Sequence, residues 1–159
     1  MSSFLQGVLD EERWPIDRLL PESVRSTVDD LRRGRLLIVA AFILTAAAAF
    51  FGLTSYETEG SFLGVAGILL VGSVFAIANV PLLWTLGLRR TSVLLCVEHV
   101  FFVWVAGLTG SGAVDPSVWW LAPAPLVATV LLGSRAGLIS ALACSAGVVG
   151  EYLAQTKGG

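Results

Sequence analysis

Residues 79–100 read NVPLLWTLGLRRTSVLLCVEHV. Long apolar runs flank this stretch on both sides, and Arg89 and Arg90 interrupt them just after Trp84. Arginines collect at the cytoplasmic surface of a bilayer, and tryptophan is enriched at its interface. We therefore predict a helical hairpin that leaves the membrane at Arg89 and Arg90 and enters it again.

The composition agrees with a membrane setting. Of the 159 residues, 55% are hydrophobic and 14% are charged, whereas soluble domains carry roughly 25% charged residues. Several apolar runs approach or exceed the ~18 residues typical of a spanning helix. Cys96 and Cys144 lie within such runs, where cysteine is usually a small packing residue. The chain is predicted to be an all-α integral membrane bundle without a separate soluble domain.

The positions of the basic residues predict the topology. Nine of the ten Lys and Arg residues lie before the first apolar run or in the segments GLRRTS and GSR. The positive-inside rule then places the N-terminus in the cytoplasm. This arrangement predicts about five spans and a short external tail, residues 154–159, whose Lys157 departs from the rule. The spans are expected near residues 36–53, 62–86, 91–108, 118–132 and 136–153.

Residues 1–35 form a charged, amphipathic N-terminal segment. They contain six arginines and seven acidic residues. Apolar residues recur at helical spacing, among them Val24, Val28 and Leu31, so one face of the segment is expected to lie on the membrane surface. The alternative is a solvated cytoplasmic lead-in. The segment lacks a basic start followed by an apolar core and a cleavage site, so no cleaved signal peptide is expected.

Residues 109–126, TGSGAVDPSVWWLAPAPL, interrupt the apolar pattern on the predicted external side. Asp115 precedes a proline, a sequence that favours a turn followed by a new helix. Trp119 and Trp120 then lie where an interfacial aromatic belt is expected. We expect this loop to reverse the chain and to set the depth of the next helix. The alternative is a cap that covers a ligand.

The fourth and fifth spans carry helix breakers and small residues. Pro123 and Pro125 predict that the fourth helix either begins late or kinks. Small residues four apart favour close helix contacts in the fifth span; these pairs are Gly137 with Ala141, Ala143 with Gly147, and Ala146 with Gly150.

Polar residues inside the predicted spans are the candidate functional residues. Asn79 and Glu98 are about equally far from the turn at Arg89 and Arg90, so they are expected at the same depth and within reach of each other. With His99 they would form a cluster whose protonation can switch, which suits the sensing of a ligand, a proton or a redox partner. The alternative is structural: a neutral glutamic acid and a histidine that hold helices together.

The chain lacks the patterns of common catalytic sites. It has no HExxH, P-loop or dinucleotide-binding motif, and we expect neither an enzyme nor a cofactor. His99, the one histidine, leaves a second possibility, an axial ligand of haem or of a chlorophyll-type pigment. Ligation by two histidines would then require a homodimer.

Three segments resemble the membrane input domain of bacterial sensor histidine kinases and nucleotide cyclases. They are NVPLLWTLGLRRTS at residues 79–92, GLTGSGAVDPSVWWLAPAPL at 107–126 and LLGSRAGLISALA at 131–143. Asp115 stands where that family usually has serine. The resemblance implies a multi-pass protein of the bacterial inner membrane, with a sixth span and an output domain that this sequence does not contain.

We therefore expect a non-enzymatic module for signal input or membrane anchoring. Its partners would be the lipid bilayer and other membrane proteins, such as a signalling kinase or cyclase, and not a nucleic acid. The first alternative is an accessory subunit of a larger membrane complex, and the second is a small-molecule transporter.

Overall fold

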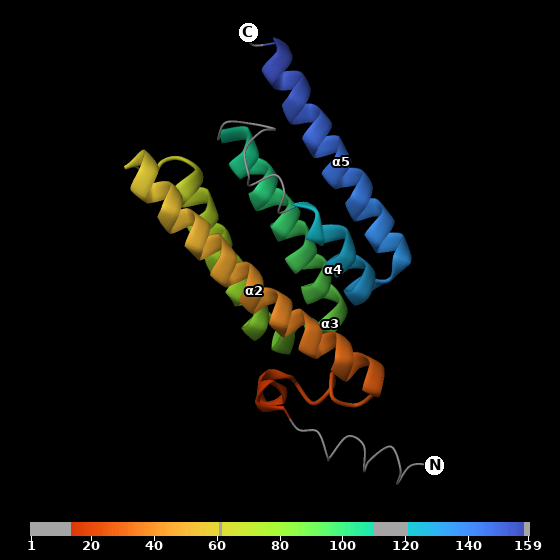
Figure 1. The fold of residues 1–159 in the computed structure, drawn as a ribbon. Coiled ribbons are helices and arrows are strands. Elements are labelled where there is room, and N and C mark those ends of the chain that lie inside the picture. Colours follow the sequence, from red (N-terminus) through yellow and green to blue (C-terminus); the bar gives the residue numbers. More distant parts are fainter. Residues whose placement is uncertain (1–13, 61, 110–120, 158–159) are drawn as a thin grey trace.

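The computed structural model describes residues 14–60, 62–109 and 121–157, and these residues form helices without any strand. A 3-10 turn, η1 (Pro15–Leu19), precedes four helices (Figure 1). The predicted all-α class is confirmed. The helices are α2 (Val28–Glu59), α3 (Val65–Thr109), α4 (Pro123–Leu132) and α5 (Ser134–Lys157).

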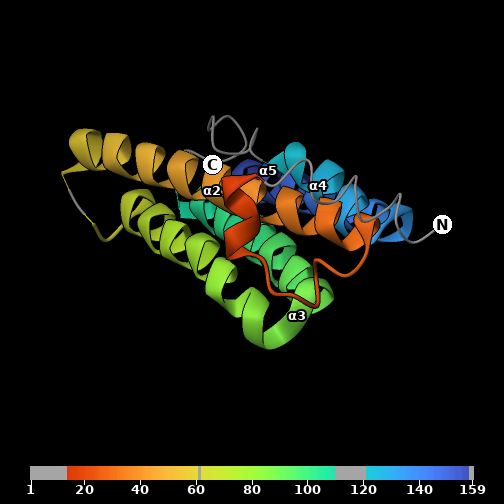
Figure 2. The same cartoon turned by 90° about the horizontal axis from the view of Figure 1, so that it is seen from below.

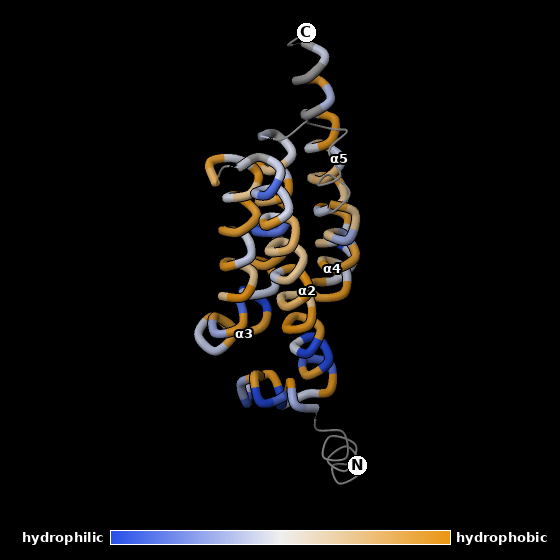
Figure 3. Tube along the Cα trace, turned by 60° about the vertical axis from the view of Figure 1, so that its left-hand side comes forward, coloured by the Kyte–Doolittle hydropathy of each residue, from blue (hydrophilic) through white to orange (hydrophobic). Residues whose placement is uncertain are grey.

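Two of the helices in the described ranges, α2 and α3, are long and apolar enough to cross a membrane. Their most apolar windows have mean hydropathies of 2.6 and 2.2, yet only 22% and 39% of these windows is buried inside the protein. Soluble proteins usually bury such surfaces. Apolar residues cover much of the helices, while the hydrophilic residues concentrate near the beginning of α2 (Figure 3). This distribution favours association with a membrane.

Helix α3 consists of two arms that run in opposite directions. Gly87, with φ 75° and ψ 168°, separates them, and this backbone conformation is open almost only to glycine. The buried Thr91 and Ser92 begin the second arm, and their hydroxyls donate to the carbonyls of Gly87 and Leu88 at 2.9 and 2.8 Å. The predicted reversal is therefore present. Figure 2 shows the bend from below.

Helices α4 and α5 form a second hairpin with a similar glycine turn. Gly133 has φ 98° and ψ 172°, and its N–H donates to the carbonyl of Thr129 at 2.9 Å. Gly137 lets the two helices approach closely, because a Cβ there would overlap the side chain of Thr129 and lie 3.1 Å from the carbonyl oxygen of Pro125.

The prolines of α4 begin the helix. Pro123 is the first helical residue, and Pro125 follows within the same turn. The N–H groups of a first turn have no partner within the helix, so proline loses no hydrogen bond there. Within the described residues the helix thus begins at Pro123, as the late-start alternative predicts.

The segment before α2 packs against the helices as a cap. Leu20 and Val24 are buried in one cluster with Leu31 of α2. Gly34 permits this contact, because a Cβ there would come within 2.5 Å of Val24 and 2.8 Å of Leu20. Val24 and Leu31 therefore face the protein interior, and neither the predicted membrane-surface face nor the solvated alternative describes them. Val28 is exposed.

The cap and both glycine turns lie at the same end of the bundle (Figure 1). Leu83 and Leu88 flank the first turn, Leu131 and Leu132 precede the second, and all four belong to the apolar cluster that holds the cap. At the opposite end a separate cluster joins α2 to both arms of α3. The bundle thus has one arginine-rich end and one end without this concentration of charge.

Candidate functional site

The hairpin of α3 places Asn79 opposite Glu98. Asn79 lies on the first arm and is fully buried. Its Nδ2 donates to Glu98 Oε2 at 2.6 Å and to the carbonyl of Phe75 at 3.0 Å. Counting residues from the turn predicts this contact, and the structure contains it. The functional role assigned to the pair stays a prediction.

The amide side chain of Asn79 has one acceptor atom that is not used. Its Oδ1 is buried and has no hydrogen-bond partner within the described residues. A buried carbonyl oxygen without a donor costs about 1–3 kcal/mol. Such an atom is suited to accept a hydrogen bond from a water molecule or a small donor.

A small cavity of about 40 Å³ lies beside Glu98. Glu98 and His99 contribute its titratable groups. Its other walls are apolar and come from α2 and both arms of α3, including Leu44, Leu69 and Phe102. A single water needs roughly 10–15 Å³ of such space, so the cavity accommodates a few water molecules. The structure thus places a carboxyl and an imidazole in a small, mostly apolar space.

His99 shares the cavity with Glu98 but lies at a different angle on the helix, as neighbouring residues must. Its ring is half-buried. The space beside it is far too small to enclose a haem or a chlorin ring. No cluster of three or more His, Cys, Asp or Glu residues suited to a metal occurs in the described ranges. A pigment on His99 would have to bind outside this cavity.

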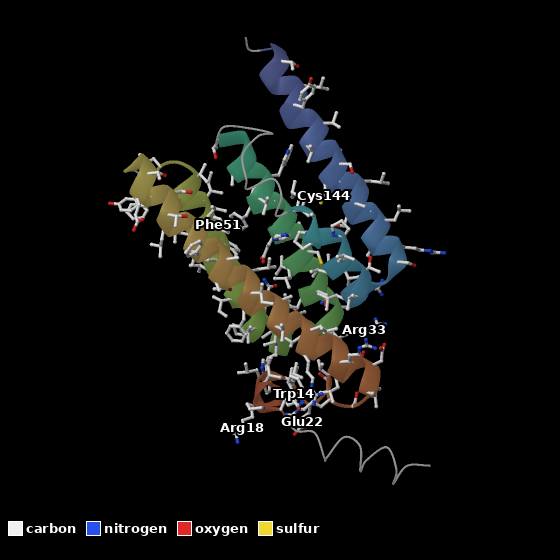
Figure 4. The ribbon with its side chains drawn as sticks, in the orientation of Figure 1. Trp14, Arg18, Glu22, Arg33, Phe51 and Cys144 are labelled. Atoms are coloured by element: carbon white, nitrogen blue, oxygen red, sulfur yellow. The ribbon has the colours of Figure 1, made fainter. Side chains whose placement is uncertain are left out.

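A second polar arrangement fastens the cap to α2. Arg35 Nε and Nη2 donate to the two carboxylate oxygens of Asp17, each at 2.7 Å. The backbone N–H of Trp14 donates to the same carboxylate at 3.1 Å. The centroid of the Trp14 ring lies 5.7 Å from the guanidinium carbon of Arg35. The hydrogen bonds from Arg35 are the main reason why the pKa of Asp17 is lowered from its ordinary value of 3.8. Figure 4 labels Trp14 in this region.

Trp84 adds a contact between the cap and α3. Its Nε1 donates to the carbonyl of Leu19 at 3.0 Å, while 56% of the residue remains exposed. The position suits the interfacial role expected of Trp84. The hydrogen bond is an additional role that the sequence did not predict.

Sequence reasoning missed the cap as a unit. The signals were present: Gly34 interrupts the charged run RRGR, and Leu20, Val24 and Leu31 are spaced to face one side. The acid that pairs with Arg35 lies 18 positions away, beyond any local pattern. Of the other predicted site residues, Asp115, Trp119 and Trp120 lie outside the described residues.

Comparison with known proteins identifies no relative: no family model, curated protein or solved structure matches this chain.

Proposed function

We propose that this chain is a five-span membrane protein with a cytoplasmic N-terminus that serves as a signal-input or anchoring module. The common location of the cap and both glycine turns supports this topology. Arg89, Arg90 and Arg135 lie at or next to these turns, which matches the positive-inside rule. Helices α4 and α5 would supply the fourth and fifth spans.

The observation that carries the proposed role is the Asn79–Glu98 hydrogen bond beside a small cavity that Glu98 and His99 line. Among the cavity-lining residues, Glu98 and His99 are the groups that titrate. Ionisation of Glu98, or an occupant of the cavity, changes the bond between the two arms of α3. Because the arms also pack against α2, such a change alters the outer surface that partners contact. The module would signal through that surface without an enzymatic step.

The test compares Glu98→Gln with the unmodified full chain in native membranes. Proteins crosslinked to each are quantified at pH 6 and pH 8. The proposal predicts that association with a kinase or cyclase depends on pH in the unmodified chain and loses this dependence in the variant. Thr45→Val, which removes a hydroxyl bonded mainly to its own helix at the Ala41 carbonyl, is the control. If the association of Glu98→Gln depends on pH as it does in the unmodified chain, with unchanged stability, the switch is refuted.

A second candidate is an accessory subunit of a larger membrane complex. The end of α5 favours it, because a Cβ on Gly150 would meet no atom within 4 Å. An open small residue of this kind permits close approach of another helix. Copurification at a fixed stoichiometry, independent of pH and of Glu98, would support the subunit over the sensor.

A further inference from the structure

A larger groove lies between the second arm of α3 and the hairpin of α4 and α5. Its volume is about 450 Å³, and it is partly open at the side. The walls are almost entirely apolar. The exposed residues among them include Val93, Val97, Phe101, Trp104 and Ile139. A single water needs roughly 10–15 Å³ of such space, so the groove has room for an extended hydrocarbon chain.

The length of the groove corresponds to one leaflet. On α3 it extends from Val93 to Trp104, which is about 16 Å at ~1.5 Å per residue. The hydrocarbon core of a bilayer is about 30 Å thick. A partner helix would cross both leaflets and is about 10 Å wide. The groove therefore fits an acyl chain better than a transmembrane helix.

Positive charge lies at one end of the groove. Arg89 and Arg90 precede Val93 by four and three residues, so they lie on the same face of the α3 arm. Arg135 precedes Ile139 by four residues on α5 and likewise shares its face. All three arginines are exposed, and within the described residues none of them forms an ion pair. Their guanidinium groups are available to bind phosphate.

We propose that the groove binds one acyl chain of an anionic glycerophospholipid of the cytoplasmic leaflet. Arg89, Arg90 and Arg135 hold its phosphate, and the chain extends along the groove to Trp104. This inference rests on the membrane placement and orientation proposed above and does not depend on the signalling role. Glu98 and His99 line the small cavity of about 40 Å³ and not the groove. A negative result in the Glu98→Gln test would therefore not contradict the lipid site.

The experiment measures lipids retained by the purified full chain. Native mass spectrometry follows binding of phosphatidylglycerol and of phosphatidylcholine with identical acyl chains. We expect one retained phosphatidylglycerol per chain, in preference to phosphatidylcholine. Replacing Arg89, Arg90 and Arg135 together with Gln should reduce this preference by about tenfold or more, because basic residues near a lipid surface attract anionic headgroups. Replacement with Lys should preserve most of it.

Two matched controls separate the groove from general effects. Gln at Arg18, Arg25 and Arg32 removes the same charge at the same end of the bundle and should leave the preference unchanged. Ala143→Phe fills the groove and should abolish retention of both lipids, whereas Ala46→Phe, at an exposed position of α2, should not.

Three results would overturn the lipid site. The first is equal retention of the two lipids, or retention of neither, by the unmodified chain. The second is unchanged binding in Ala143→Phe. The third is a crosslink from Cys96, which lines the groove, to another polypeptide in native membranes, because a partner helix would then occupy it.

Discussion

Two hairpins among the described residues, the one within α3 and the one of α4 and α5, turn in the same way but pack differently. Gly87 and Gly133 adopt nearly the same backbone conformation. The first hairpin packs along α2 and encloses the hydrogen bond between Asn79 and Glu98. The second is held together at Gly137 and leaves a groove of about 450 Å³ against α3.

The turn of each hairpin is a local property, whereas its packing is a tertiary one. A glycine with positive φ reverses a helix wherever its neighbours are helical. What the resulting hairpin does depends on the residues along its arms. A buried polar side chain needs a hydrogen-bonding partner at the same depth on the other arm. Small residues, in contrast, only allow a neighbouring helix to pack closely. The first hairpin is therefore the better candidate for a switch, and the second for a binding surface.

The largest expected effect is at the contact within the second hairpin. Gly137→Leu should lower the free energy of unfolding by about 3 kcal/mol, because the backbone carbonyl of Pro125 cannot move aside for the new side chain. Unfolding by SDS in mixed micelles measures the loss. Gly150→Leu is the control, since nothing lies within 4 Å of a Cβ there. Equal losses in both variants would mean that the α4–α5 contact is not as close as described.

Alanine at the two turns tests whether they are equivalent. Gly87→Ala and Gly133→Ala should each cost about 2 kcal/mol, because both force a non-glycine residue into a strained conformation. A Cβ meets no atom within 4 Å at either position, so strain alone sets the cost. The same SDS titration measures it. A difference above about 1 kcal/mol between the variants would show that the surrounding hairpin contributes.

Removing the polar pair tests the interior of the first hairpin. Asn79→Leu should cost about 1.5 kcal/mol, because Glu98 loses its donor while remaining among apolar residues. The double variant Asn79→Leu, Glu98→Leu should recover much of this loss, since neither polar group is then left unpaired. Ser73→Ala is a control, as its hydroxyl donates to Leu70 of the same helix. Additive losses in the double variant would argue against coupling between the arms.

The smallest effect is expected at the cap that both turns adjoin. Asp17→Asn should cost about 1 kcal/mol at neutral pH. The pKa of Asp17 is lowered in the folded chain, so the stabilisation is fully present above the ordinary value of 3.8 and is lost as the pH falls through the folded-state pKa. Thermal unfolding of both chains from pH 7 downward should therefore show curves that converge below 3.8.

The exposed ion pair between Arg33 and Asp29 is the control for the cap. Its side chains are 40% and 68% exposed, against 23% and 11% for Arg35 and Asp17. Asp29→Asn should change stability by only about 0.3 kcal/mol. A larger effect there than at Asp17 would mean that the cap is not fastened through Arg35.

Several features could be predicted because they depend on neighbours in the chain. The helices follow from apolar runs and from the glycines and prolines that end or begin them. The contact between Asn79 and Glu98 follows from equal distances to one turn. The pairing of Asp17 with Arg35 and the docking of Leu20 against Gly34 could not be predicted, because each joins residues whose approach depends on how the cap folds back.

An all-helical chain with reversals next to Arg89 and Arg90 and at the segment GSR follows from the sequence alone, since helix length and charge placement are local properties. Which faces of the helices meet follows from the packing of the folded chain. It buried Val24 and Leu31 in a cap, gave Glu98 and His99 a common cavity, and left a groove beside α5. These features depend on how side chains from segments far apart in the sequence pack together.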